Sequence, residues 1–220
     1  MAHGTVDVTK MGGLFGVVSK NDLAKNLYFG VDYHSHLGTE VGGLAFLDKD
    51  IEVISRDISN SQFKSRFHDD YGKIRGRLGI GVISDLDEGQ PVEFESKIGT
   101  FALCTTGLVR NARELYLELI KSGTTFKRSR VKSSGTVMNQ TEIVGELISR
   151  GEDVVDGIER VHEKVEGFIS LLLLSKEDRS IYASGDAFPF AIGRRGEDWA
   201  IASETASFPN LGYGIYKFLV

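Results

Sequence analysis

The sequence is poor in cysteine and proline and has no long apolar run. Its 220 residues include one cysteine and three prolines. Because Cys104 is the only cysteine, an internal disulfide is excluded, and the composition fits a reducing compartment. No apolar run approaches the roughly 20 residues that a membrane-spanning helix needs, and residues 1–10 lack the features of a secretory signal. We therefore expect a cytoplasmic protein that does not bind membranes.

An excess of positive charge is also missing. The chain has 26 Lys and Arg residues against 31 Asp and Glu residues, a formal net charge of -5. Strongly basic proteins bind nucleic acids and anionic membranes, so we expect neither as a partner. What is present is a hydrophobic fraction of 41% in a chain long enough to bury one core. The composition predicts one globular domain. We expect this domain over residues 11–220, preceded by an extension or pro-segment at residues 1–10.

Apolar runs with the length of β-strands recur along the chain. The two clearest, residues 79–83 (GIGVI) and 170–174 (SLLLL), are continuous rather than alternating, which predicts strands that are buried on both faces. The predicted strands are Gly13–Ser19, Gly43–Leu47, Ile51–Arg56, Arg77–Ser84, Thr100–Gly107, Phe168–Ser175, Ile181–Ser184, Phe190–Gly193 and Trp199–Ser203.

Three amphipathic helices are predicted in the second half of the chain, after Asn111, after Asn139 and over residues 154–165. A glutamate stands three residues after each asparagine, which is the spacing of a capping box. Residues 21–36 and 60–74 have a weaker helical pattern. Because groups of strands alternate with pairs of helices, the order favours a layered α+β domain over a doubly wound parallel sheet.

Six segments resemble the glutaminase domain of class II glutamine amidotransferases, the N-terminal-nucleophile hydrolase type. They are residues 11–19 (MGGLFGVVS), 33–44 (YHSHLGTEVGGL), 105–112 (TTGLVRNA), 139–142 (NQTE), 165–174 (VEGFISLLLL) and 201–205 (IASET). Their order, together with the last string, is most similar to the amidophosphoribosyltransferase branch of purine synthesis. The resemblance implies a four-layer αββα sandwich. It implies neither a metal nor another cofactor.

The nucleophile that this resemblance implies is absent. In the family, the segment that matches residues 11–19 carries a cysteine, which is both the first residue of the mature chain and the nucleophile. Gly12 holds that place here, and a hydrogen atom cannot attack an amide carbon. At the position where the family has the asparagine that binds the oxyanion, this chain has Thr106, and the glycine that follows is retained as Gly107. Losing one oxyanion donor costs about 100-fold or more in rate.

The substrate-binding positions that the resemblance implies are also changed. The arginine that holds the carboxylate of glutamine in the family falls near Ser84, with Asp85 beside it. A hydroxyl among acids cannot replace a bidentate cation. At the position where the family has the aspartate that binds the ammonium group of glutamine, this chain has Gln140, which is followed by Thr141. All these changes together predict the loss of glutamine binding.

Three hypotheses about function follow. The first is an amidophosphoribosyltransferase-like domain without glutaminase activity. It would work with a phosphoribosyltransferase domain, in the native chain or in a partner, that uses free ammonia and phosphoribosyl pyrophosphate. The second is a non-catalytic module that binds a glutamine-like or altered small ligand, or makes homo-oligomer contacts. The third is hydrolysis by another nucleophile, Thr5 or Thr9, after cleavage.

The remaining reactive side chains have simpler interpretations. Cys104 lies in an apolar strand, where cysteine is usually a small buried hydrophobe. His34 and His36 could contact one metal ion, but no other ligand has a suitable spacing, so we expect structural hydrogen bonds. His68 is expected on a solvated helix face.

Two charged segments remain open. The basic run at residues 127–132 (KRSRVK) is expected to be an exposed loop, with contact to a phosphorylated ligand or a partner domain as the alternative. Asp85, Asp87 and Glu88 could form an acid/base pair, but no nucleophile or partner base accompanies them, so an acid-rich loop is expected.

Overall fold

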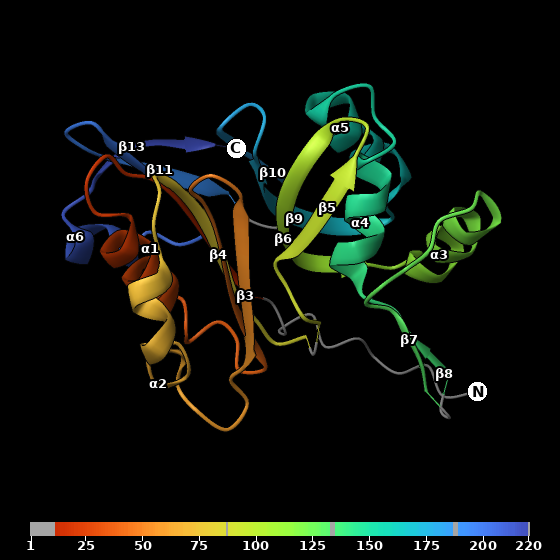
Figure 1. Ribbon diagram of the computed structural model, residues 1–220, viewed down its shortest axis with the longest axis horizontal. Coiled ribbons are helices and arrows are strands. Elements are labelled where there is room, and N and C mark those ends of the chain that lie inside the picture. Colours follow the sequence, from red (N-terminus) through yellow and green to blue (C-terminus); the bar gives the residue numbers. More distant parts are fainter. Residues whose placement is uncertain (1–11, 87, 133–134, 187–188, 220) are drawn as a thin grey trace.

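Two antiparallel β-sheets lie face to face between two layers of helices in a computed structural model (Figure 1). It describes residues 12–86, 88–132, 135–186 and 189–219. The larger sheet has the order β13-β11-β12-β1-β4-β2-β3, and the smaller has the order β10-β9-β6-β5. The strands of the larger sheet are β1 (Gly13–Val18), β2 (Val41–Leu47), β3 (Ile51–Asp57), β4 (Leu78–Ser84), β11 (Phe190–Arg195), β12 (Asp198–Ala202) and β13 (Gly214–Leu219). The other strands are β5 (Val92–Ser96), β6 (Gly99–Val109), β9 (Gly167–Ser175) and β10 (Ser180–Gly185), with the hairpin β7 (Arg130–Lys132) and β8 (Gly135–Val137).

The helices form the two outer layers. α1 (Leu23–Asp32), α2 (Phe63–Arg66), the 3-10 helix η1 (His68–Lys73) and α6 (Ser207–Leu211) lie beside the larger sheet. α4 (Gln140–Ile148) and α5 (Val154–Lys164) pack on the smaller sheet, and α3 (Ala112–Lys121) contacts α4. None of the helices in these ranges has the length and apolar character that a membrane crossing requires.

Alternation along the strands builds separate cores on the two faces of each sheet. In β1, Leu14 belongs to the core between the sheets, whereas Phe15 and Val17 belong to the core beneath α1 and α6. In β4, Val82 lies between the sheets and Ile83 faces the helices. A further core lies between the smaller sheet and α4 and α5. Sheets buried on both faces explain the continuous apolar runs, and the predicted α+β sandwich is confirmed.

The nine predicted strands all form, with small differences at their ends. β5, the hairpin of β7 and β8, and β13 were not predicted, and β7 covers the second half of the basic run at residues 127–132, which was wrongly expected to be a loop throughout. In β5, Val92 and Phe94 alternate with exposed glutamates. Asn139 caps α4 as predicted, because its side chain accepts a hydrogen bond from the Glu142 amide at 2.8 Å. Asn111 was wrongly predicted as a side-chain cap.

The weaker helical segments are shorter than predicted. Residues 21–36 contain only α1, and residues 60–74 divide into α2 and η1. The proposed extension at residues 1–10, with Thr5 and Thr9, and also Met11 and Asp87 lie outside the described residues.

Candidate functional site

Gly12 stands immediately before β1, between the two sheets. Its amide donates a hydrogen bond to Oγ1 of Thr106 at 2.8 Å, across 94 positions of sequence. Thr106 faces the larger sheet because side chains alternate along β6, where Cys104 lies in the core between the sheets. Both residues are buried. Gly12 and Thr106, two positions of the predicted site, are therefore joined by a hydrogen bond that links the two sheets.

No space exists for a side chain at Gly12. A Cβ built on this residue would lie 2.1 Å from the carbonyl oxygen of Ile83 and 3.1 Å from Cα of Ser84. Gly38 approaches the same backbone, since its Cβ would lie 2.7 Å from the carbonyl carbon of Ser84. The last residues of β4 therefore run between two glycines, in contact too close for any other residue type.

Ser84 and Asp85 bind backbone at the end of β4. Oγ of Ser84 accepts a hydrogen bond from the Leu86 amide at 3.0 Å, and the Ser84 carbonyl accepts one from the Glu40 amide at 3.0 Å. Oδ1 of Asp85 accepts hydrogen bonds from the Thr39 amide at 2.8 Å and the Thr39 hydroxyl at 3.2 Å. These two predicted substrate-site residues close the loop between α1 and β2 onto β4.

Gln140 is held at the end of β6, at the start of α4. Its side-chain oxygen accepts a hydrogen bond from the Val109 amide at 2.8 Å. Its backbone amide donates to the Glu88 carboxylate at 2.8 Å, and its side-chain amide donates to the same group at 3.3 Å. Glu88 is buried and orients Gln140, rather than lying in a solvated acidic loop.

Thr141 is separated from Gly12 by the smaller sheet. Its hydroxyl lies 2.6 Å from the hydroxyl of Thr105 and donates to the side-chain oxygen of Gln90 at 3.2 Å. Thr105 and Thr106 are neighbours in a strand and point to opposite faces. The fold therefore brings Gly12, Thr106 and the Ser84 backbone together, and it places Thr141 on the other side of the smaller sheet.

Gly107 has a backbone role in β6. Its φ of 124° lies in the region that favours glycine, and a Cβ there would lie 2.3 Å from the carbonyl oxygen of Phe168. The retention of this glycine next to Thr106 is explained by the close contact of β6 with β9.

The two histidines near the site bind different protein groups. His34 is buried, and its Nδ1 donates to the Gly30 carbonyl at 2.7 Å. Burial lowers the pKa of His34, so its imidazole is neutral at pH 7. Nε2 of His36 lies 2.8 Å from Oε2 of Glu204. These contacts agree with the structural hydrogen bonding that the sequence analysis favoured over a shared metal ion.

Glu142 organises the loop before β7, and the sequence analysis missed this role. Its buried carboxylate accepts hydrogen bonds from the amides of Lys127, Arg128 and Ser129 at 2.6, 2.9 and 2.9 Å. Of these three residues, only Lys127 is exposed; the other two are half-buried. The position of Glu142 in a capping box was the available signal, but it indicated the helix start and not the loop.

The only thiol lies away from solvent. Cys104 is fully buried in the core between the sheets, and burial raises the pKa of its thiol well above the usual value. The prediction of a buried apolar role for this residue is confirmed.

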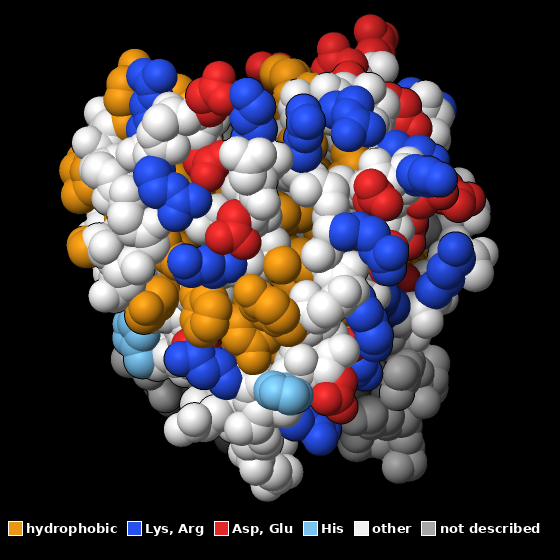
Figure 2. All heavy atoms as spheres, turned by 60° about the vertical axis from the view of Figure 1, so that its left-hand side comes forward, with side chains coloured by type: hydrophobic (Ala, Val, Ile, Leu, Met, Phe, Trp, Pro, Cys, Tyr) orange, Lys and Arg blue, Asp and Glu red, His pale blue; other side chains and the backbone are white. Residues whose placement is uncertain are grey.

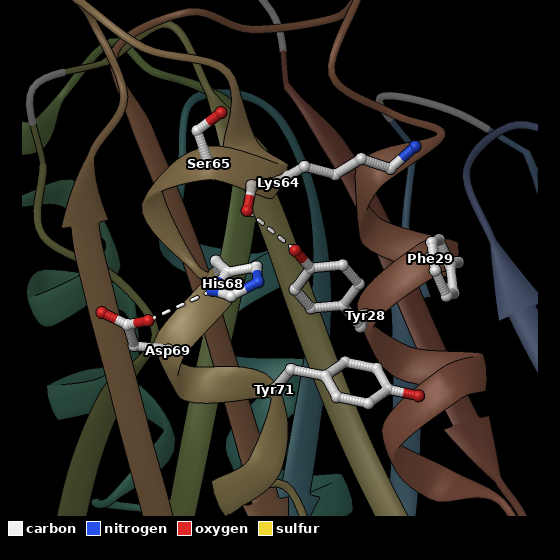
Figure 3. A pocket seen from close by; sticks show the side chains of 7 residues that line it. All are labelled: Tyr28, Phe29, Lys64, Ser65, His68, Asp69 and Tyr71. Atoms are coloured by element: carbon white, nitrogen blue, oxygen red, sulfur yellow. Dashed lines mark hydrogen bonds and ion pairs between the residues drawn. The ribbon is translucent and has the colours of Figure 1, made fainter.

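A separate cavity of about 710 Å³ lies between α1 and the α2–η1 segment (Figure 3). Its walls are mainly aromatic: Tyr28, Phe29 and Tyr71, with Lys64 alongside. His68 and Asp69 form its exposed border, 3.2 Å apart, as predicted for a solvated helix face. Figure 2 shows apolar side chains gathered on this side of the molecule, with lysine and histidine side chains around them. None of the predicted site residues lines this cavity.

The chain was compared with protein families, curated proteins and solved structures. No family model matches it. It is 26% identical to the amidophosphoribosyltransferase of Methanocaldococcus jannaschii and 24% identical to that of Bacillus subtilis. Both matches cover 91% of this chain but only 44% and 42% of those relatives. The chain therefore spans less than half the length of these curated relatives.

The structural comparison supports the same relationship. The glutamine phosphoribosylpyrophosphate amidotransferase of B. subtilis, solved with ADP and GMP, superposes with a TM-score of 0.79 at 23% identity. This match covers 94% of this chain and 45% of that one. The sequence matches and the shared fold agree. The chain is therefore a homologue of the amidophosphoribosyltransferases and has the fold of their class II glutamine amidotransferase domain.

Proposed function

We propose that this chain is an amidophosphoribosyltransferase-like amidotransferase domain that does not hydrolyse glutamine. The observation that carries the proposal is the closed space at Gly12, where even a Cβ would lie 2.1 Å from the Ile83 carbonyl oxygen. A nucleophilic residue at this place needs both a side chain and room for a substrate carbonyl beside it. The backbone of β4 occupies that room.

The other changed positions support the proposal. The Thr106 hydroxyl stands at the place of the oxyanion-binding asparagine and already accepts a hydrogen bond from the Gly12 amide. At the substrate-binding positions, Ser84, Asp85 and Gln140 bind backbone amides of this chain. An oxyanion or a substrate carboxylate would have to compete with these hydrogen bonds. The bond between Gly12 and Thr106 is buried, so its loss leaves unsatisfied groups.

A transferase partner completes the proposed activity. The matched relatives are named amidophosphoribosyltransferases and are about twice as long as this chain. We propose that a phosphoribosyltransferase domain, in the native protein or in a partner, combines free ammonia with phosphoribosyl pyrophosphate. The domain over residues 11–220 would then have a supporting role. The second candidate, a non-catalytic small-ligand module, is favoured by the aromatic-lined cavity, whose volume is in the usual range for ligand sites.

The first experiment measures glutamate release from glutamine by the wild type and by Gly12→Cys, both made with Met11 as the initiator so that its removal exposes residue 12. Gly72→Cys controls for an added thiol, since a Cβ at Gly72 has no atom within 4 Å. None of the three proteins is expected to release glutamate above the rate of the blank. Glutamate release by the wild type would overturn the proposal. Activity of Gly12→Cys alone would mean that the pocket still binds glutamine and that β4 moves aside.

The transferase half of the proposal needs the full-length protein. Pyrophosphate release from phosphoribosyl pyrophosphate is measured with ammonium chloride and, separately, with glutamine as the nitrogen source. Turnover with ammonia but not with glutamine is expected. A full-length protein that is inactive with ammonia, or equally active with glutamine, would contradict it.

A further inference from the structure

Two cavities share the side chain of Lys64 as a wall. The cavity of about 710 Å³ described above is lined mainly by aromatic rings. A second cavity, of about 600 Å³, lies between the loop after α1 and the segment before α2. Its walls are mainly polar and include Asp32, Ser61 and Gln62. Because Lys64 lines both cavities, an aromatic compartment and a polar compartment meet at one charged side chain.

The aromatic compartment is built by α1 and η1. Tyr28 is buried, and its hydroxyl donates a hydrogen bond to the Lys64 carbonyl at 2.8 Å. The rings of Phe29 and Tyr71 meet the Tyr28 ring edge to face, with 5.2 and 5.1 Å between centroids (Figure 3). Tyr71 is 38% exposed, so part of its ring is open to a further contact. Aromatic rings attract other rings in stacked or edge-to-face arrangements, and this compartment therefore favours a ligand with an aromatic ring.

An ion pair stands beside these rings. Nζ of Lys64 lies 2.9 Å from Oδ2 of Asp32 and 5.5 Å from the ring centre of Phe29. α1 brings Asp32 to this point, because residues three and four positions apart on a helix, here Phe29 and Tyr28, share a face with it. The Lys64 side chain is 52% exposed and that of Asp32 is 14% exposed. A cation and an anion that solvent still reaches therefore lie next to an aromatic surface.

The charge pattern of these walls selects the charge of the ligand. His68 and Asp69, at the border of the aromatic compartment, are almost fully exposed, and such pairs contribute little to recognition. Recognition of charge therefore depends on Asp32 and Lys64. Like charges placed together weaken binding, so Asp32 disfavours an anion and Lys64 disfavours a cation. A zwitterion, which carries one charge of each sign, is complementary to both.

We propose that the two compartments together bind a zwitterionic aromatic α-amino acid. Its ring packs against Tyr71 and Phe29. Its carboxylate pairs with Lys64 and its ammonium group pairs with Asp32, so that four charges alternate in sign. The inference names the ligand of the second candidate function, the small-ligand module, and it rests on that candidate. It uses none of the positions at which the glutamine site is changed.

Isothermal titration calorimetry of the 220-residue chain with L-phenylalanine tests the proposal. Saturable binding of one molecule per chain is expected. Two further probes separate the two halves of the ligand: L-alanine has the charges without the ring, and N-acetyl-L-phenylalanine amide has the ring without the charges. Each is expected to bind about tenfold more weakly or less, because each loses the contacts of one compartment. A neutral amide that binds as tightly as L-phenylalanine would overturn the assignment of Asp32 and Lys64.

Variants then place the ligand on the chain. Asp32→Asn, Lys64→Met and Tyr71→Ala are each expected to weaken L-phenylalanine binding about tenfold, with circular dichroism confirming that they fold. Leu117→Ala is the matched control, because Leu117 is 46% exposed on α3 and lines neither cavity. It is expected to bind like the wild type.

Two results would overturn the inference: a wild type that does not bind L-phenylalanine, and binding that all three cavity variants leave unchanged. Neither result bears on the proposed loss of glutaminase activity, which the glutamate-release assay measures separately. Conversely, glutamate release by the wild type would overturn that proposal and leave the binding result as it stands. The two failures are therefore distinguishable.

Discussion

Replacing Gly12 by alanine is expected to lower the free energy of unfolding by about 3 kcal/mol. The new Cβ would lie 2.1 Å from the Ile83 carbonyl oxygen, whereas ordinary contact begins at 3.4 Å. The obstacle is backbone of β4, which pairs with both β1 and β2 and cannot rotate aside. Overpacking of this kind costs about 1–3 kcal/mol. If residue 12 moves away instead, its amide loses the hydrogen bond to Thr106, which is worth about 1 kcal/mol.

Urea and thermal unfolding, followed by circular dichroism and by the single tryptophan, measure this loss. In a chain of this size 1 kcal/mol changes Tm by about 2–4 °C, so a decrease of about 6–12 °C is expected. Gly72→Ala is the matched control, because its Cβ meets no atom within 4 Å. It is expected to stay within about 0.5 kcal/mol of the wild type.

The refuting result is a Gly12→Ala protein that is as stable as Gly72→Ala. The segment before β1 would then move away from β4 at no cost. The closed space at Gly12 could no longer explain why a nucleophile is excluded there, and the proposed loss of glutaminase activity would rest on the other changed positions alone.

Three further predictions concern buried polar groups. Thr106→Val removes the acceptor of a buried amide and is expected to cost about 1–3 kcal/mol in urea unfolding, while Thr106→Ser restores most of it. Glu142→Gln weakens charge-assisted hydrogen bonds to the loop before β7, so limited proteolysis is expected to cut that loop faster than in the wild type; equal rates would contradict this. Burial lowers the pKa of His34 below the 6.5 of an exposed imidazole, so the unfolded chain takes up the proton first. Stability is therefore expected to be full above pH 6.5 and to fall as the pH decreases below it, and His34→Gln should reduce this slope in unfolding curves measured at several pH values.

Local patterns predicted most of the secondary structure. The continuous apolar runs at residues 79–83 and 170–174 are buried strands because each sheet is covered on both faces. β5 was missed, although it has clear alternation, and β13 was missed because its apolar residues are exposed. Asn111 shows the limit of cap prediction. Its side chain bridges the Lys164 carbonyl and the Glu166 amide, more than 50 positions away, and a local motif contains no information about such partners.

The candidate site was only partly predictable. Resemblance to the family identified Gly12, Thr106 and Ser84, and the fold brings these three positions together. It also grouped Thr141 with them, which the fold contradicts, because Thr141 lies beyond the smaller sheet against Thr105. Glu142 was assigned to a helix start, whereas its carboxylate also accepts hydrogen bonds from three amides of the loop before β7. A residue type reveals which bonds a side chain can form, but it does not reveal which groups are within reach.

The sequence by itself determined most of the strands, the three stronger helices, the layered α+β class and the absence of a cysteine at position 12. These follow from periodicity and residue identity, which act over a few neighbouring positions. Only the tertiary structure decided that β4 closes the space beside Gly12, that the changed polar residues bind backbone, and that β13 ends the larger sheet with its apolar side chains exposed. Apart from the hydrogen bond of Ser84 to the nearby Leu86 amide, each of these is a contact, or the lack of one, between segments far apart in the chain. Such contacts depend on how the sheets pack.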